Sequence, residues 1–307
     1  MTISKLPLEG RAALVTGAGR GLGRAYVLAL AQHGAAVAVN SRSEESVAAV
    51  VSEITRRGGR AIGCAGDLEE QGVPEAVVDA TLRAFGHLEV LVNNAGGDTA
   101  PSAPFAAIGR AERDAMMRKN FDTAWDVTAA AWAHLAAAGS GRIVLTSSTL
   151  AFYGQPGLAH YAAAKGAIVG LARTLAAEGR EHGLTVNVLN PIANTGERKV
   201  FVRWPGSSFP VEHVAAALAW MTSERCTVTG QILSIGGTRM ARVSITENTG
   251  HVGETGFTHP DEAARNLDEI LHGGDSLEVF EMAEFTEYLD RTYGELRGPS
   301  PNPNSGD

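Results

Sequence analysis

The chain has 307 residues, 44% hydrophobic and 20% charged, enough to bury a sizeable core in one large α/β domain or two small ones. Its formal net charge of -8, with no Lys/Arg run longer than a pair, argues against a surface for nucleic acid or anionic membrane. The two cysteines, Cys64 and Cys226, lie far apart and predict neither a disulfide framework nor a zinc site. With no apolar leader and no long apolar run, we expect a cytoplasmic protein without a metal.

Apolar runs that end at Gly or Asn recur along the chain and predict short buried strands. They cover residues 12–17, 35–40, 61–66, 88–96, 141–148, 184–191 and 231–237. Because these runs do not alternate with polar residues, we expect burial on both faces of a sheet. The segments between them have apolar residues three to four apart and end at Gly, as helices do. This alternation predicts an α/β fold with a doubly wound parallel sheet of the Rossmann type over residues 1–237.

The pattern changes after Gly237. Residues 242–247 fit one more extended segment, and residues 260–274 and 276–296 predict two amphipathic helices. We therefore expect a helical C-terminal extension over residues 238–297, packed on the main domain or on a partner subunit. The composition of residues 298–307 predicts a disordered tail.

A glycine-rich loop, TGAGRGLG at residues 16–23, follows the first predicted strand and opens a helix. Its glycines permit a tight turn and close backbone approach, while the helix N-terminus presents free N–H groups to a pyrophosphate. A turn that only packs helix on strand is the alternative. We predict a dinucleotide site whose loop residues are Gly17, Arg20, Gly21, Leu22 and Gly23.

The choice between NAD(H) and NADP(H) depends on the end of the second strand. A site for NAD usually places a carboxylate there, whereas this chain has Asn40, Ser41 and Arg42. Arg42, together with Arg20, suits the 2'-phosphate of NADP(H) through charge-assisted hydrogen bonds, unless both arginines are solvated loop residues. Ser41 and Arg42 therefore predict that NADP(H) is preferred and NAD(H) possible.

Tyr161 and Lys165 lie one turn apart in a predicted helix, and Ser148 ends the strand before it. A tyrosine is a poor base at neutral pH, but a nearby ammonium and an oxidised nicotinamide would both favour its phenolate. Tyr161 would then be the general acid in ketone reduction and the general base in alcohol oxidation, while Ser148 would hold the substrate oxygen. An ordinary surface pair is the alternative for this spacing taken alone.

The loop TGAGRGLG, NNAG at residues 93–96, Asn120, Ser148 and Y-x-x-x-K together resemble the short-chain dehydrogenase/reductase family over residues 8 to about 237. The resemblance implies a tetrad in which Asn120 holds a proton-relay water and Lys165 also binds the nicotinamide ribose. It implies that Asp67 contacts the adenine and that Ile192 stands where many members have glycine. The further cofactor residues that it implies are Asp67, Leu68, Asn94, Ala95, Gly96, Pro191, Ile192 and Thr195.

A narrower resemblance, which includes the C-terminal part, is to the dehydrogenase unit of peroxisomal multifunctional enzymes and its stand-alone bacterial relatives. It implies a hydroxyacyl-CoA or hydroxysteroid substrate and a dimer over which the extension wraps. From the sequence we expect a homo-oligomer, dimer or tetramer, and the charge predicts no nucleic-acid or membrane partner. Ser41 departs from the acidic residue of those enzymes, so a biosynthetic ketoreductase stays open. A non-catalytic NADP(H)-binding regulator, and an epimerase or dehydratase, are the alternatives from other classes.

Overall fold

The computed structural model describes residues 8–97, 102–195, 209–251, 260–274, 276–278, 282 and 284–289. The chain divides into two compact units, residues 1–243 and 244–307. In the described part of the chain, no helix is long and apolar enough to cross a membrane.

The first unit is built on an eight-stranded sheet in the order β3-β2-β1-β4-β5-β6-β7-β8. All neighbouring strands pair in parallel except β7 and β8, which are antiparallel. The seven strands expected from the apolar runs are confirmed as β1 to β7, and β8 is an eighth strand. The strands are β1 (Ala12–Val15), β2 (Ala36–Ser41), β3 (Arg60–Ala65), β4 (Val90–Asn93), β5 (Arg142–Thr146), β6 (Thr185–Ile192), β7 (Ile232–Gly236) and β8 (Arg239–Val243).

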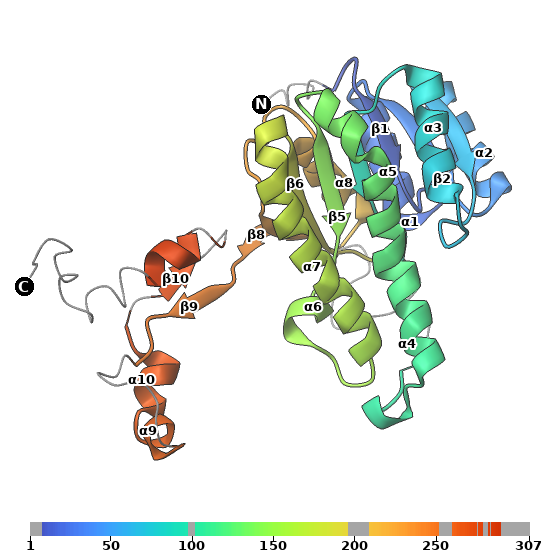
Figure 1. Ribbon diagram of the computed structural model, residues 1–307. Coiled ribbons are helices and arrows are strands. Elements are labelled where there is room, and N and C mark those ends of the chain that lie inside the picture. Colours follow the sequence, from blue (N-terminus) through green and yellow to red (C-terminus); the bar gives the residue numbers. More distant parts are fainter. Residues whose placement is uncertain are drawn as a thin grey trace, which may run out of the picture. The chain divides into compact units, whose positions relative to one another are not determined.

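Helices cover both faces of this sheet (Figure 1). One core cluster joins the sheet to α1, α2 and α8, and a second joins it to α3, α5 and α7. Successive β1 residues point to opposite faces, so Ala13 and Val15 enter the first cluster and Leu14 the second. The helices are α1 (Gly21–Gln32), α2 (Glu44–Arg56), α3 (Val73–Phe85), α4 (Arg110–Met117), α5 (Thr123–Ala137), α6 (Leu150–Tyr153), α7 (Ala159–Gly179) and α8 (Val211–Met221).

Both edge strands of the sheet differ from what the sequence predicts, and β3 is the one expected to be buried on both faces. β3 is largely exposed or half-buried, because it is the edge strand of the sheet. β8 is the opposite edge, and its antiparallel pairing with β7 extends the first unit to Val243, beyond the predicted domain end at residue 237. The predicted division into domain, extension and tail stays a prediction, and residues 298–307 lie outside the described part of the chain.

The second unit contains short elements. β9 (Thr246–Asn248) pairs antiparallel with β10 (Ser276–Glu278), and the segment 242–247 expected as one extended piece is therefore split between β8 and β9. The helix expected over residues 260–274 is broken into α9 (Pro260–Arg265) and α10 (Leu267–His272) at Asn266, a poor helix former. Residues 276–278 form a strand instead of opening the second predicted helix, because their backbone pairs with β9.

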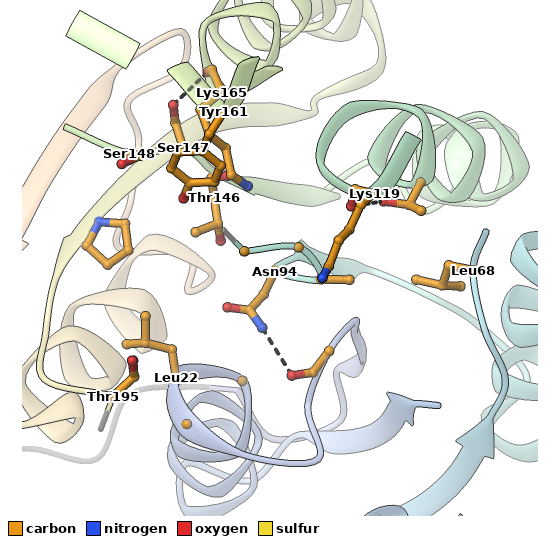
Figure 2. A pocket seen from close by; sticks show the side chains of 18 of the residues that line it. Leu22, Leu68, Asn94, Lys119, Thr146, Ser147, Ser148, Tyr161, Lys165 and Thr195 are labelled. Carbon is orange, nitrogen blue, oxygen red and sulfur yellow. Dashed lines mark hydrogen bonds between the residues drawn. The ribbon is translucent and has the colours of Figure 1, made fainter. Parts of the chain in front are cut away.

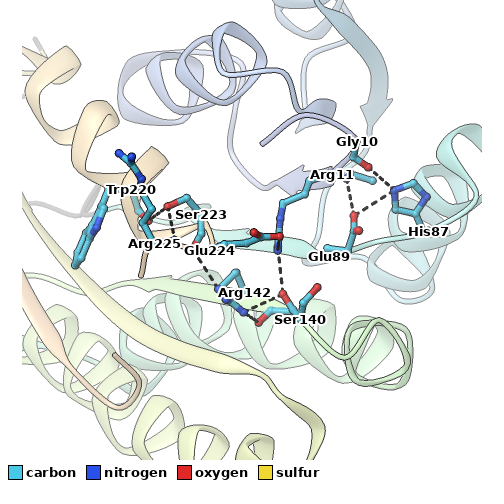
Figure 3. A network of polar contacts seen from close by, with 12 residues as sticks. Gly10, Arg11, His87, Glu89, Ser140, Arg142, Trp220, Ser223, Glu224 and Arg225 are labelled. Carbon is cyan, nitrogen blue, oxygen red and sulfur yellow. Dashed lines mark hydrogen bonds and ion pairs between the residues drawn. The ribbon is translucent and has the colours of Figure 1, made fainter. Parts of the chain in front are cut away.

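A polar network ties strand ends together on the side of the sheet away from the carboxyl ends (Figure 3). Arg11 precedes β1 and Arg142 opens β5, and both guanidinium groups donate to the carbonyl oxygen of Ser140, at 3.1 and 2.9 Å. Arg11 also pairs with Glu224 at 3.3 Å. Burial, and then repulsion by Arg11, lowers the pKa of Arg142. The network fixes the amino ends of β1 and β5, which sets the positions of their carboxyl ends.

Candidate functional site

A cleft of about 780 Å³ lies at the carboxyl ends of the parallel strands (Figure 2). β1 lies between β2 and β4, so the strand order reverses here, and ligands of doubly wound sheets bind at such a point. The structure brings all the predicted site residues to the walls of this cleft except Asn120 and Ile192. Those on its walls are Gly17, Arg20, Gly21, Leu22, Gly23, Ser41, Arg42, Asp67, Leu68, Asn94, Ala95, Gly96, Ser148, Tyr161, Lys165, Pro191 and Thr195.

The glycine loop forms a cradle that larger residues would fill. Gly17 and Gly21 have φ angles of 62° and 54°, which residues with a side chain rarely adopt. A Cβ on Gly23 would collide with the carbonyl oxygen of Gly17 and lie 2.6 Å from Nδ2 of Asn94. α1 begins at Gly21, and the unpaired N–H groups of its first turn suit an anionic group.

Thr16 connects the glycine loop to the segment after β4. Its hydroxyl oxygen accepts from the backbone N–H groups of Asn94 and Ala95, both at 2.9 Å. The side-chain amide of Asn94 donates back to the carbonyl oxygens of Thr16 at 3.0 Å and Gly17 at 3.2 Å. Sequence reasoning gave Thr16 no role of its own, because the pairing of β1 with β4 that brings these groups together is not visible in the spacing.

The end of β2 places the hydroxyl of Ser41 beside the glycine loop and the side chain of Arg42 on the cleft wall. A Cβ on Gly19 would lie 2.7 Å from Oγ of Ser41, so this hydroxyl borders the loop closely. The side chain of Arg42 is 65% exposed, and its Nη1 atom lies 3.8 Å from a carboxylate oxygen of Asp67. Asp67 therefore balances the charge of Arg42 in the structure, and both groups line the cleft.

Lys165 is the most buried charged group on the cleft wall. Lys165 belongs to α7, one turn after Tyr161, and it is 3% exposed. Its Nζ atom donates to the carbonyl oxygen of Thr146 at 3.0 Å, and burial lowers the pKa of the ammonium to about 8. Ser148 lies just beyond the end of β5, and its Oγ accepts from the backbone N–H of Leu150 at 3.3 Å. Tyr161, Lys165 and Ser148 thus converge on one cleft from α7 and β5 (Figure 2).

Asn120 lies behind the cleft wall and not on it. It is 1% exposed in a π-helical turn (Arg118–Asp122) between α4 and α5. Its Oδ1 accepts from the N–H of Gly97 at 2.8 Å, and its Nδ2 donates to the Gly97 carbonyl at 3.2 Å. A Cβ on Gly96 would lie 2.6 Å from this Oδ1 and 3.3 Å from Nζ of Lys165. The Asn120 side chain therefore binds the backbone of Gly97, close to Lys165. Its role in holding a relay water stays a prediction.

Ile192 does not line the cleft, although its neighbours Pro191 and Ala193 do. It is the last residue of β6, in register with Gly236 of β7, and a Cβ on Gly236 would collide with its carbonyl oxygen. The backbone of Ile192 is therefore part of the sheet. Direct contact of Ile192 with a cofactor stays a prediction. The short segment of residues 196–210 predicts a lid that carries Phe201 and Trp204, and both residues lie outside the described part of the chain.

Other residues on the cleft walls were not predicted from the sequence. Most of them are neighbours in sequence of a predicted site residue, as Ser147 is of Ser148. This proximity is the signal in the sequence that could have found them. Lys119 and Thr123 come from the turn around Asn120. The unpredicted lining residues are Asn40, Gly66, Glu69, Gly97, Lys119, Thr123, Thr146, Ser147, Thr149, Leu150, Gln155, Leu158 and Ala193.

The residues of the cleft fit a nicotinamide dinucleotide. The glycine loop leaves space that a Cβ would fill, and the N–H groups at the start of α1 suit the pyrophosphate. Within the described part of the chain, no group of three or more His, Cys, Asp or Glu residues is placed to hold a metal ion.

Residues 11–199, more than half of the chain, match the model of the family described as short chain dehydrogenase. The chain belongs to the short-chain dehydrogenase family. It is therefore an oxidoreductase of a family that uses NAD(P)(H).

Known relatives agree with this assignment. Peroxisomal multifunctional enzyme type 2 of Mus musculus is 37% identical over 245 residues, which are 76% of this chain and 32% of that enzyme. Short-chain reductase protein NovJ of Streptomyces niveus is 40% identical over 179 residues, 58% of this chain and 67% of NovJ. A short chain dehydrogenase from Mycobacterium avium has a TM-score of 0.77 at 29% identity, covering 89% of this chain and 98% of that one.

The chain resembles one unit of the multifunctional enzymes. It spans 32% of the mouse enzyme, and 21% and 32% of the peroxisomal hydratase-dehydrogenase-epimerases of Neurospora crassa and Saccharomyces cerevisiae. The resemblance is to their dehydrogenase unit, and the activities of the whole enzymes do not transfer with it.

Proposed function

We propose that this short-chain dehydrogenase transfers hydride between NADP(H) and a ketone or secondary alcohol, with Tyr161 as general acid and base. One observation carries the proposal: Tyr161, Ser148 and the buried ammonium of Lys165 line the same cleft as a glycine loop suited to a dinucleotide. When bound, the nicotinamide would supply or accept the hydride.

The side chains divide the remaining chemistry among them. The hydroxyl groups of Ser148 and Tyr161 would both hydrogen-bond the substrate oxygen, and Ser148 would stabilise the charge that develops on it. Tyr161 would donate its proton in reduction and take it back in oxidation. The ammonium of Lys165, buried where the effective dielectric constant is low, would stabilise the phenolate between the two steps.

The preference for NADP(H) rests on Ser41 and Arg42. Both line the cleft where β2 ends, and the hydroxyl of Ser41 borders the glycine loop. A guanidinium group and a hydroxyl suit a 2'-phosphate, whereas a carboxylate at this place would suit the two ribose hydroxyls of NAD(H). Because the ion pair between Arg42 and Asp67 would have to break when the phosphate binds, the net free energy gained from the contact of Arg42 with the phosphate is modest.

Replacing Arg42 with Ala should weaken NADPH binding about tenfold, since a charge-assisted hydrogen bond at an exposed site contributes on the order of 1 to 2 kcal/mol. Binding of NADH should change by less than about twofold. Quenching of protein fluorescence by each nucleotide gives both dissociation constants. The matched control is Arg56→Ala, which removes an arginine from the other end of α2 and should leave both constants unchanged. Equal weakening of NADPH and NADH would contradict the assignment.

Two substrate classes remain in the proposal. The relatives named multifunctional enzymes and hydratase-dehydrogenase-epimerases favour hydroxyacyl-CoA or hydroxysteroid oxidation, whereas the relative named a reductase, together with the residues at the end of β2, favours ketone reduction in a biosynthetic pathway. We favour reduction, because enzymes linked to NADP(H) usually run as reductases in cells. We further propose a cytoplasmic homo-oligomer, dimer or tetramer.

Absorbance of the reduced nicotinamide tests this proposal directly. The protein is mixed with NADPH or NADH and with acetoacetyl-CoA, steroid ketones or aromatic ketones in turn. We expect consumption of NADPH in preference to NADH with at least one ketone class. Turnover of acetoacetyl-CoA with NADH alone would move the assignment to the hydroxyacyl-CoA class, and nucleotide binding without any turnover would favour the regulator.

A further inference from the structure

Two consecutive residues at the end of β5 hold Lys165 at both of its ends (Figure 2). The hydroxyl of Ser147 donates to the backbone carbonyl of Lys165 at 2.8 Å, and the ammonium of Lys165 donates to the backbone carbonyl of Thr146 at 3.0 Å. All three residues are buried, with exposed fractions of 2% for Ser147, 3% for Lys165 and 8% for Thr146. Within a helix, the Lys165 carbonyl already faces an N–H group one turn later, so the Ser147 contact is additional.

This arrangement restricts a side chain that is otherwise very flexible. A lysine side chain has high rotamer entropy, and fixing its backbone and its ammonium removes most of that freedom in advance. Ser148 directly follows Ser147, just beyond the end of β5, and Tyr161 lies one turn before Lys165 on α7. A bond between β5 and the backbone of Lys165 therefore fixes the height of α7 relative to Ser148.

We propose that Ser147 is a positioning residue, whose hydroxyl sets the register of α7 against β5 and so holds the Lys165 ammonium in line with the hydroxyls of Tyr161 and Ser148. The catalytic consequence rests on the proposed function, whereas the positioning of Lys165 does not. The competing interpretation is that Ser147 contributes only to stability, as a buried hydroxyl that happens to find a carbonyl.

Steady-state kinetics of Ser147→Ala, Ser147→Thr and Ser234→Ala separate these interpretations. Ser234 is a matched control, because it is a 5% exposed serine on β7 of the same sheet whose hydroxyl bonds to Asn190. We expect kcat to fall about tenfold or more in Ser147→Ala, with the KM for NADPH within about threefold of the original, and the pH profile of kcat to shift. Ser147→Thr should restore most of kcat, since it keeps the hydroxyl, and Ser234→Ala should keep the original kcat and pH profile. Equal losses in Ser147→Ala and Ser234→Ala, or an unchanged pH profile in Ser147→Ala, would overturn the proposal.

A second measurement needs no turnover. Reductive methylation with formaldehyde and cyanoborohydride modifies neutral amines, and mass spectrometry of the Lys165 peptide gives the pH midpoint of its reaction. The midpoint in the original protein should lie near the pKa of about 8 that burial imposes on Lys165. In Ser147→Ala the backbone of Lys165 is no longer tied to the end of β5, so the ammonium should shift towards the solvated cleft. The midpoint should then rise by about one pH unit, while Ser234→Ala keeps it. An unchanged midpoint in Ser147→Ala would overturn the positioning role. If the original protein turned over no ketone, the proposed function would fail while this measurement still decided the role of Ser147.

Discussion

Replacing Tyr161 with Phe should lower kcat about 100- to 10,000-fold with any ketone that the enzyme reduces. The ring remains and the phenolic hydroxyl is lost, so the substrate oxygen loses the donor that protonates it, and general acid catalysis contributes a factor of this size. Stopped-flow measurement of NADPH oxidation in a single turnover reports the chemical step without product release.

Binding of NADPH is the control for this substitution. The dissociation constant of Tyr161→Phe should stay within about threefold of the original, because the glycine loop and the residues after β2 and β4 form most of the cleft. A variant with full activity would show that Tyr161 is not the acid. A variant that binds no NADPH would show instead that the substitution had damaged the cleft.

Replacing Lys165 with Met should also abolish most activity and, at neutral pH, make the protein more stable. Activity should fall about 100-fold or more, because the phenolate of Tyr161 loses the nearest buried cation. Methionine fits the space of an unbranched lysine stem and needs no hydrogen-bond partner. The two effects have opposite signs because burial, the cause of the lowered pKa of Lys165, opposes the charged form that the chemistry needs.

The stability effect depends on pH in a defined direction. The pKa of Lys165 is about 8 in the folded chain and near 10.5 for an ordinary lysine, so the unfolded chain binds more protons between these values. Burying the ammonium therefore destabilises the fold fully below pH 8, and the penalty disappears as the pH rises to about 10.5. Lys165→Met should raise the free energy of unfolding at pH 7 by up to about 3 kcal/mol and lose this advantage by pH 10.5.

Urea unfolding at pH 7 and at higher pH measures this gain for Lys165→Met. Tyr161→Phe serves as the matched control, because it removes the hydroxyl of the proposed acid from the same helix and leaves Lys165 in place. A destabilised Lys165→Met at pH 7 would mean that the ammonium is better solvated than its burial indicates. A gain that persists unchanged above pH 10.5 would assign the stabilisation to packing and not to charge.

Much of the fold and the cleft follows from local pattern. Seven apolar runs give seven strands of the sheet. The glycines of residues 17–23 form the turn that opens α1, and the positive φ angles of Gly17 and Gly21 are ones that glycine readily adopts. Tyr161 and Lys165 reach the same cleft because four-residue spacing within a helix places them on one side. Ser148 joins them because the end of a parallel strand is where such sheets form their sites.

Other features depend on contacts between segments far apart in sequence. Asn120 lies behind Gly96 and Gly97 because a π-helical turn directs its amide to that backbone. Ile192 is the last residue of β6, and its backbone pairs with β7. The bond of Ser147 to Lys165 joins residues 18 positions apart, and nothing in the local sequence distinguishes this serine from any other at a strand end. The pairing of β9 with β10 likewise depends on tertiary context.

The central claim is that hydride passes between a nicotinamide and a carbonyl carbon while Tyr161 passes the proton. Reduction of a turned-over ketone with NADPH deuterated at the transferable position of the nicotinamide tests it most directly, with the product alcohol examined by mass spectrometry. We predict one deuterium at the carbinol carbon per NADPH consumed. The rate of alcohol formation should fall sharply in Tyr161→Phe. Product formation without deuterium or without net loss of NADPH, as an epimerase or dehydratase would give, would contradict the account.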